Sequence, residues 1–357
     1  MVELDGLRTV LAVAIVAYHV GVPGLHAGVL ALPAFFAMSG FLITNGLLAE
    51  HRREGRIALA RFARSRLLRI GPPLAVLVGG VALLWPLVGG YSDSNPNLAA
   101  AAAIALTSTT NLARLAGLRQ GVLDPIWSLA AEEQFYLLWP LAFIALFRLA
   151  RGPRILAVVL AAAVVLGPIV SVPLFAPSAD DGPPTVYYAP SLSMSALCAG
   201  CLGALVINSA RRRGQWNPAA QRCTMWAGAA SLGVIVALFP AGWKSDPASI
   251  LVLMPTAAIA STALIAGLEH PGTALAPALR WRPLVWYGAN ATYSLYLWHV
   301  VVLATMLHLG SGAAIRGAAL VISIGVGALL GVVVEQPMAR LRRRLDSRPT
   351  IRRGHAR

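Results

Sequence analysis

The sequence carries little charge for its length. Only 12% of its 357 residues are Asp, Glu, Lys or Arg, and 57% are hydrophobic, whereas about 25% charged residues is usual in a soluble domain. The mean hydropathy is +0.70. Several apolar runs reach the roughly 20 residues that a helix needs to cross a bilayer. These features exclude a soluble globule, and we expect a polytopic membrane protein.

Acidic residues and lysine are scarce. Asp and Glu number 14 against 29 Lys and Arg, and Lys244 is the only lysine. In a soluble chain the formal charge of +15 would suggest a nucleic-acid partner. Here the arginines lie in short connections between apolar runs, as the positive-inside rule describes for cytoplasmic loops. We therefore expect the lipid bilayer, and no nucleic acid, as a partner.

The three cysteines are too few for a disulfide framework. Cys198 and Cys201 form a CxxC inside an apolar segment without a second pair, so we interpret them as small packing residues and predict no metal site. Glu3 and Asp5 stand where a signal peptide needs basic residues. The first apolar run is therefore predicted to remain as a transmembrane helix.

Eleven apolar segments are candidate spans, near residues 5–22, 28–48, 71–90, 98–113, 128–147, 155–175, 190–208, 224–243, 248–268, 288–309 and 316–334. If all cross, the arginine loop 148–154 falls outside and the loop with Asp180 and Asp181 falls inside, against the charge rule. The segment 98–113 is short and ends in a polar run. We therefore predict an all-α bundle of about ten transmembrane helices, with 98–113 a re-entrant or surface segment and both termini cytoplasmic.

Five ionisable side chains fall within apolar runs: Arg8, His19, Glu132, Glu133 and His299. Each costs at least a few kcal/mol at membrane depth and is a functional candidate by default. Arg8 and His19 are eleven residues apart, which puts them on one helix face roughly 16 Å apart, with Asp5 on the same face. Arg8 could instead snorkel to the headgroups, and His19 could be a hydrogen-bonded core histidine.

Two adjacent carboxylates follow Trp127 in an apolar run. Neighbouring residues on a helix point about 100° apart, so only one of Glu132 and Glu133 is expected to face His19, and which one stays open. A carboxylate bonded to a buried imidazole would fix its tautomer and raise its basicity, as a general base requires.

Other residues carry one or two interpretations. Arg66 and Arg69, one turn apart, could clasp phosphate groups or serve topology and lipid headgroups. Ser39 and Gly40 favour close helix packing. His299 follows Tyr296 by three residues and could contact an acceptor or make a packing hydrogen bond. Glu335 is expected to pair with a nearby arginine.

The ordered set of these motifs resembles the membrane acyltransferase 3 family, which includes bacterial polysaccharide O-acetylases and macrolide acyltransferases. The matching stretches are Asp5-Gly6-Leu7-Arg8 with His19, Phe35 to Ile43, Arg66-Leu67-Leu68-Arg69, Trp127 to Pro140, Tyr293 to His299, and Glu335-Gln336-Pro337. Two departures are Pro33, where the family often has Asp, and 191–197, where it often has an Arg.

The resemblance implies a ten-helix bundle that moves an acyl group from cytoplasmic acyl-CoA to a hydroxyl, usually of a sugar. We expect a transmembrane domain over 1–340 and a basic cytoplasmic tail over 341–357. Family members often carry an SGNH esterase-like domain after the bundle, and we expect none in this sequence. We also expect no permanently bound cofactor, and acyl-CoA as a co-substrate.

The sequence thus predicts a multi-pass O-acyltransferase of the inner or plasma membrane, with a carbohydrate or glycosylated small molecule as acceptor. Arg8, Arg66 and Arg69 would bind the CoA phosphates, and His19 would act as general base, oriented by Glu132 or Glu133. A covalent acyl-histidine is a less favoured variant. The residues expected to contact the substrates are Asp5, Ser39, Trp127, Tyr296 and His299. The alternatives are a transporter or flippase that uses the buried charges as a pathway, and a membrane scaffold.

Overall fold

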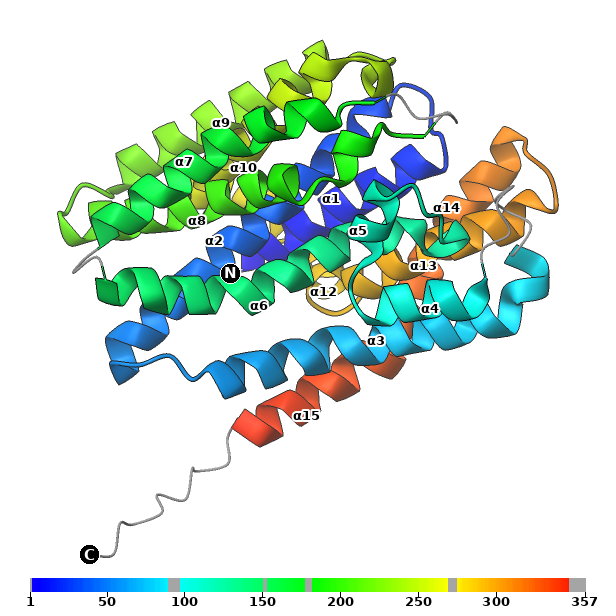
Figure 1. The fold of residues 1–357 in the computed structure, drawn as a ribbon, viewed down its shortest axis with the longest axis horizontal. Coiled ribbons are helices and arrows are strands. Elements are labelled where there is room, and N and C mark those ends of the chain that lie inside the picture. Colours follow the sequence, from blue (N-terminus) through cyan, green and yellow to red (C-terminus); the bar gives the residue numbers. More distant parts are fainter. Residues whose placement is uncertain (1, 89–96, 150–152, 177–181, 269–274, 347–357) are drawn as a thin grey trace, which may run out of the picture.

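The structure, a computed structural model, describes the whole chain except residues 1, 89–96, 150–152, 177–181, 269–274 and 347–357. It is 86% helical, and no strand occurs in the part that it describes. The helices run roughly parallel to the long axis of the molecule (Figure 1). Asp180, Asp181 and most of the predicted tail lie outside the described residues.

The long helices follow the predicted apolar segments closely. They are α1 (Val2–His19), α2 (Ala31–Glu54), α3 (Leu59–Val88), α6 (Trp127–Leu149), α7 (Pro153–Ser171), α8 (Pro190–Arg212), α9 (Pro218–Leu238), α10 (Met254–Gly267), α13 (Thr292–Leu307) and α14 (Ala313–Leu330). Seven helical stretches in the described chain are long and apolar enough to cross a membrane. The chain is therefore an all-α polytopic membrane protein, and the count of ten spans stays a prediction.

The predicted re-entrant or surface segment consists of two short helices, α4 (Leu98–Leu106) and α5 (Thr110–Leu115). At 1.5 Å per residue neither can cross about 30 Å of hydrocarbon. The polar run between them is bonded to α6, because the Gln134 amide donates to the Ser108 carbonyl and to Asn111 Oδ1, each at 2.8 Å. These bonds explain polar side chains in an otherwise apolar stretch.

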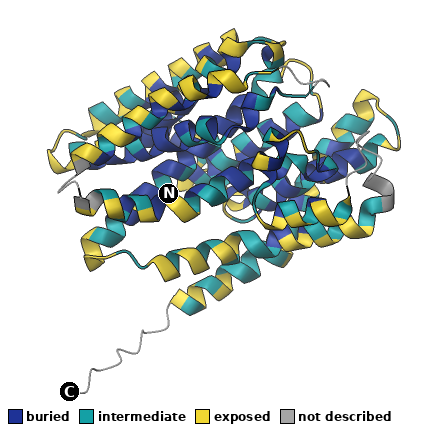
Figure 2. Cartoon of the chain, viewed as in Figure 1, coloured by how far each residue is buried: buried dark blue, intermediate teal, exposed yellow. Residues whose placement is uncertain are grey.

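Helices α2 and α8 approach closely in the buried centre of the bundle (Figure 2). A Cβ atom on Gly40 would collide with the Leu197 carbonyl, and one on Gly200 with the Ala37 carbonyl. The close packing predicted for this small pair is confirmed at Gly40. Cys198 and Cys201 are free thiols buried on α8, as predicted, and the Cys201 thiol lies 3.5 Å from the Gly40 carbonyl oxygen.

Helix α15 (Gln336–Asp346) packs along α3 at the edge of the bundle (Figure 1). Arg64 of α3 forms an ion pair with Asp346 at 2.8 Å. The predicted domain boundary at residue 340 therefore falls inside a helix, and the basic tail begins as part of the packed structure.

Glu335 does not meet the arginine that the sequence suggested. Its carboxylate accepts a hydrogen bond of 2.9 Å from the backbone N–H of Ser294, in the first turn of α13. The chain breaks between α12 (Arg282–Asn290) and α13 at Ala291. The first N–H groups of a helix have no partner within it, so Glu335 satisfies one of them at this break.

Candidate active site

Helix α1 brings two of the predicted residues to two different cavities. Arg8 lines a cavity of about 230 Å³, which we call the arginine cavity. His19 lines a larger one of about 580 Å³, which we call the histidine cavity. Eleven residues of helix separate the two side chains by roughly 16 Å along the axis. One helix therefore connects the two candidate sites.

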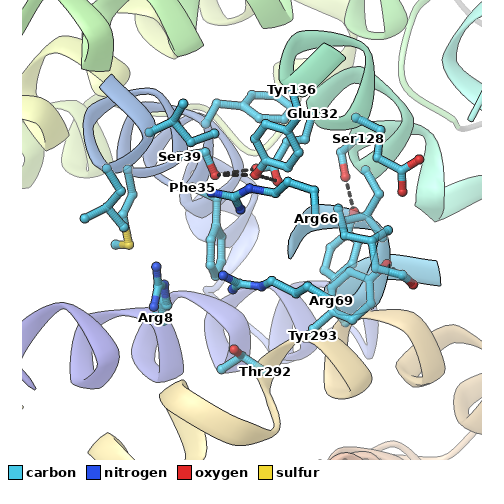
Figure 3. Close-up of a pocket in the computed structure, with 18 of the residues that line it drawn as sticks. Arg8, Phe35, Ser39, Arg66, Arg69, Ser128, Glu132, Tyr136, Thr292 and Tyr293 are labelled. Carbon is cyan, nitrogen blue, oxygen red and sulfur yellow. Dashed lines mark hydrogen bonds between the residues drawn. The ribbon is translucent and has the colours of Figure 1, made fainter. Parts of the chain in front are cut away.

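Three arginines point into the arginine cavity, Arg8 from α1 and Arg66 and Arg69 from α3 (Figure 3). Arg8 forms an ion pair of 2.7 Å with Asp5. Asp5, which was predicted to contact a substrate, thus orients Arg8. The guanidinium of Arg66 lies over the ring of Tyr136, 4.5 Å from its centroid. The structure thus brings the predicted phosphate-binding set together. Planar guanidinium groups converging in this way suit a bidentate anion such as phosphate.

A hydrogen-bonded cluster forms another part of the wall of the arginine cavity (Figure 3). Glu132 accepts from Ser39 at 2.9 Å and from Tyr136 at 2.7 Å, and Tyr136 lies 3.2 Å from the Ser39 hydroxyl. Glu133, on the next face of α6, accepts from Ser108. Sequence analysis missed Tyr136, although its i+4 spacing from Glu132 was a signal for such a pair.

His19 and His299 form a pair beside the histidine cavity. The Nδ1 of His299 lies 2.6 Å from the Tyr296 carbonyl oxygen, and the Nδ1 of His19 lies 2.9 Å from the Ile15 carbonyl oxygen. A carbonyl oxygen only accepts, so both Nδ1 atoms carry a hydrogen. The Nε2 of His299 then accepts from the Nδ1 of His19 at 3.3 Å. In this neutral tautomer the Nε2 of His19 holds a lone pair for a partner in the cavity.

The structure does not bring either glutamate to His19. Trp127, the first residue of α6, lines the histidine cavity, but Glu132 lies five residues further along, about 7.5 Å of helical rise. That distance takes Glu132 into the arginine cavity, where Ser39 and Tyr136 occupy its oxygens. The groups that orient His19 are the Ile15 carbonyl, at 2.9 Å, and His299, at 3.3 Å. Two roles were predicted for His299, an acceptor contact and a packing hydrogen bond. The structure shows the hydrogen bond, and the His299 side chain is fully buried and lines neither cavity.

Tyr296 stands where the two cavities adjoin. It lines both of them, together with Leu32. Its hydroxyl donates to the Pro125 carbonyl at 2.8 Å and lies 2.5 Å from the hydroxyl of Ser128. Since the phenol hydrogen is used on Pro125, Ser128 is the donor in the second bond. The predicted substrate contact of Tyr296 is thus placed between the arginines and the histidine pair.

Aromatic rings form much of the wall of the histidine cavity. Trp127 packs against Tyr187 and Tyr188, with centroid distances of 4.8 and 5.2 Å. Polar residues of the same wall that the sequence analysis missed come from loops and short 3-10 turns, and they are Arg119, Asp124 and Lys244. The only available signal was that Lys244 is the single lysine. Among the described residues no group of His, Cys, Asp or Glu side chains is placed to hold a metal ion.

Comparison with known proteins gives a consistent set of relatives. The chain is 26% identical over 310 residues to the peptidoglycan O-acetyltransferase OatA of Listeria monocytogenes, covering 84% of this chain and 49% of that protein. It is 28% identical over 320 residues to the putative peptidoglycan O-acetyltransferase YrhL of Bacillus subtilis, covering 85% and 49%. Against the O-acetyltransferase OatA of Staphylococcus aureus it is 27% identical over 315 residues, covering 84% and 50%. The chain thus spans about half the length of these relatives.

No solved structure matches the chain. The family described as "Acyltransferase domain" (Acyl_transf_3) matches residues 1–334, which include both cavities and the histidine pair. The match confirms the resemblance drawn from the motifs. The chain belongs to this acyltransferase family.

Proposed function

We propose that the protein is an integral-membrane O-acyltransferase. It moves a short acyl group, such as acetyl, from acyl-CoA to a hydroxyl of a saccharide, a glycan or a glycosylated natural product. The observation that carries the proposal is the His19 imidazole, held in one tautomer at the edge of a large cavity. Three arginines converge in the neighbouring cavity, about 16 Å away along α1. The relatives, which are named O-acetyltransferases, support the same reaction class.

The arginine cavity is the donor site in this proposal. Arg8, Arg66 and Arg69 bind the CoA phosphates, for which guanidinium groups offer paired donors. The pantetheine arm then extends along α1 past Tyr296 toward His19. The roughly 16 Å between Arg8 and His19 is comparable with the length of that arm.

His19 acts on the acceptor. Its Nε2 removes the hydrogen of the acceptor hydroxyl as that oxygen attacks the thioester carbonyl carbon. The carbon–sulfur bond breaks, and the imidazolium returns the proton to the departing CoA thiolate. The Ile15 carbonyl and the His299 Nε2 both accept from the Nδ1 of His19 throughout, which keeps the base in the required tautomer. Glu132 takes no proton in this scheme and positions Tyr136 beneath Arg66.

The test is acyl-CoA hydrolysis or exchange by the purified protein, with acetyl-, propionyl-, butyryl- and isovaleryl-CoA. A positioned general base contributes about 10² to 10⁴ in rate, so we expect His19→Ala to lose turnover by that factor while remaining folded. His308→Ala is the matched control, since that histidine is exposed and lines neither cavity. Wild-type turnover by His19→Ala would contradict the assignment.

The same preparation separates the enzyme from a transporter. A ligand that binds only the native state stabilises it in proportion to RT ln(1 + [L]/Kd). We expect CoA to raise the melting temperature of the wild type and of His19→Ala, but less that of Arg8→Ala. Neither turnover nor stabilisation by CoA is the result expected of a transporter or scaffold.

A further inference from the structure

A third cavity, of about 30 Å³, lies beside the two that the proposed reaction uses, and we call it the side cavity. It shares Leu32 and Phe36 with the arginine cavity. It shares Leu32, Trp127 and Tyr187 with the histidine cavity. Leu32 thus lines all three. The side cavity therefore adjoins the place where a thioester that extends from the arginines would meet His19.

The side cavity is apolar and lies inside the bundle. Helices α2, α6, α8 and α10 and the 3-10 turn Thr185–Tyr188 contribute to its wall, and every residue that lines it is buried. Leu192 of α8 and Met254 of α10 are among them. Apolar cavities stay free of water and bind apolar groups. The side cavity thus suits a hydrocarbon group, and not a sugar or a phosphate.

The volume of the side cavity limits what it can hold. About 10–15 Å³ of such volume holds one water molecule. The 30 Å³ of the side cavity therefore has room for about two groups of that size. An acetyl group has one carbon beyond its carbonyl and a propionyl group has two, whereas butyryl has three and isovaleryl has four. The side cavity thus matches the two shorter acyl groups.

A larger cavity with apolar walls, of about 490 Å³, lies between α3 and α6. It shares Arg66 and Tyr136 with the arginine cavity and no described residue with the histidine cavity. An acyl group bound there would lie beside the CoA phosphates and away from the base. The side cavity is therefore the better placed of the two for the reacting end of the donor.

We propose that the side cavity holds the hydrocarbon end of the acyl group and so sets the chain length that is transferred. With the thioester carbonyl at His19, the alkyl carbons extend past Leu32 and Trp127 into the side cavity. The residues of its wall position the acyl group and exchange no proton with it. This inference rests on the proposed function and narrows its donor to acetyl-CoA and propionyl-CoA.

The experiment measures kcat/KM of the purified full chain for hydrolysis or exchange of acetyl-, propionyl-, butyryl- and isovaleryl-CoA, without an acceptor. One methylene more or less in an apolar pocket changes kcat/KM by about 10- to 200-fold. We expect the kcat/KM values of acetyl- and propionyl-CoA to exceed those of butyryl- and isovaleryl-CoA by at least about tenfold. Equal values for all four, or a preference for the longer chains, would overturn the inference.

Variants link the chain length to the wall of the side cavity. Met254→Ala and Leu192→Ala enlarge it from two different helices, so each should raise kcat/KM for butyryl-CoA relative to acetyl-CoA by about tenfold. Met225→Ala is the matched control and should keep the wild-type ratio, because Met225 is also buried but lines none of the three cavities. The ratio compares two substrates in one preparation, so a lower yield of folded protein does not change it.

Failure of the inference and failure of the proposed function give different results. An unchanged ratio in both Met254→Ala and Leu192→Ala, with His19-dependent turnover intact, contradicts the inference alone. Absence of His19-dependent turnover with every acyl-CoA contradicts the proposed function, and the inference with it.

Discussion

At the residue scale, the two histidines show how a buried hydrogen-bond chain determines which nitrogen is available. Two carbonyl oxygens fix the hydrogens on the Nδ1 atoms, and the Nε2 of His299 shares the Nδ1 hydrogen of His19 with the Ile15 carbonyl. A base held in this way needs no carboxylate. His299 is therefore a positioning residue, since it touches His19 and not a cavity.

His299→Phe should lower kcat by about twofold to tenfold. The substitution removes one of the two acceptors of the His19 Nδ1–H and leaves the Ile15 carbonyl; a typical hydrogen bond is worth about 0.5–1.5 kcal/mol net, or up to about one order of magnitude in rate. His299→Gln offers an amide oxygen in place of Nε2 and should restore part of the rate. The KM for acyl-CoA should stay constant in both variants, because His299 lies outside the arginine cavity.

Steady-state kinetics with acetyl-CoA check this assignment. A purely structural role for His299 would change folding yield or melting temperature and leave kcat per folded molecule unaltered. A rise in KM without a fall in kcat would place His299 in donor binding instead.

The sequence predicted some of these residues and missed others for physical reasons. Arg8 and His19 lie on one helix, whose geometry is regular. Their shared face could therefore be predicted from their spacing in the sequence. One of Glu132 and Glu133 was predicted to face His19, because their depth along the membrane was read from topology alone. Besides Tyr136 on its own helix, the partner of Glu132 is Ser39, 93 residues away on α2. The rotation of α6 relative to α2 depends on packing that no local pattern encodes.

At the element scale, the crossing of α2 and α8 depends on glycine. Gly200→Ala would press a methyl group against the Ala37 carbonyl, where backbone and not a flexible side chain must move. Overpacking of this kind costs about 1–3 kcal/mol. We expect Gly200→Ala to lower the melting temperature in a given detergent clearly below that of the wild type.

Gly46→Ala is the matched control on α2. A Cβ at Gly46 meets no atom within 4 Å, and the residue is exposed. Its melting temperature should equal or slightly exceed that of the wild type. Equal melting temperatures for Gly200→Ala and Gly46→Ala would mean that the two helices tolerate a wider separation.

Hydropathy located most helices but not the breaks within them. The predicted segment 288–309 is in fact divided at Ala291 between α12 and α13. This break is stabilised by Glu335, which lies 41 residues beyond Ser294. A cap supplied from such a distance leaves no local signal. The break at 107–109 was more visible, because polar residues there interrupt an alanine-rich run.

At the scale of the whole molecule, the two cavities lie at different levels along α1. Acyl-CoA is cytoplasmic, so the proposed reaction requires the arginine cavity to face the cytoplasm. Leu4 and Leu7, at the arginine end of α1, pack in one cluster with Met225 of α9. Lys244, just after α9, lines the histidine cavity. The start of α9 therefore lies toward the arginine end of α1, and the end of α9 lies toward the histidine cavity.

The native cysteines make the sidedness testable. Cys223, near the start of α9, is exposed, whereas Cys198 and Cys201 are buried. A membrane-impermeant maleimide should therefore label Cys223 in inverted vesicles and not in right-side-out vesicles. In a Cys223→Ser background, Ala241→Cys, in the exposed turn after α9, should show the reverse pattern, because 21 residues of helix rise by about 31 Å, the thickness of the hydrocarbon core.

The pair of labels distinguishes three topologies. Opposite labelling in the expected sense supports a crossing α9, and with it a donor site in the cytoplasm and an acceptor site outside. Labelling of both positions from one side means that α9 does not cross and that the ten-span prediction is wrong. Labelling with both sides exchanged would put the arginines beyond the reach of cytoplasmic acyl-CoA. In that case the donor assignment fails even if His19 proves essential, because the side labelled at the start of α9 is also the side of the arginine cavity.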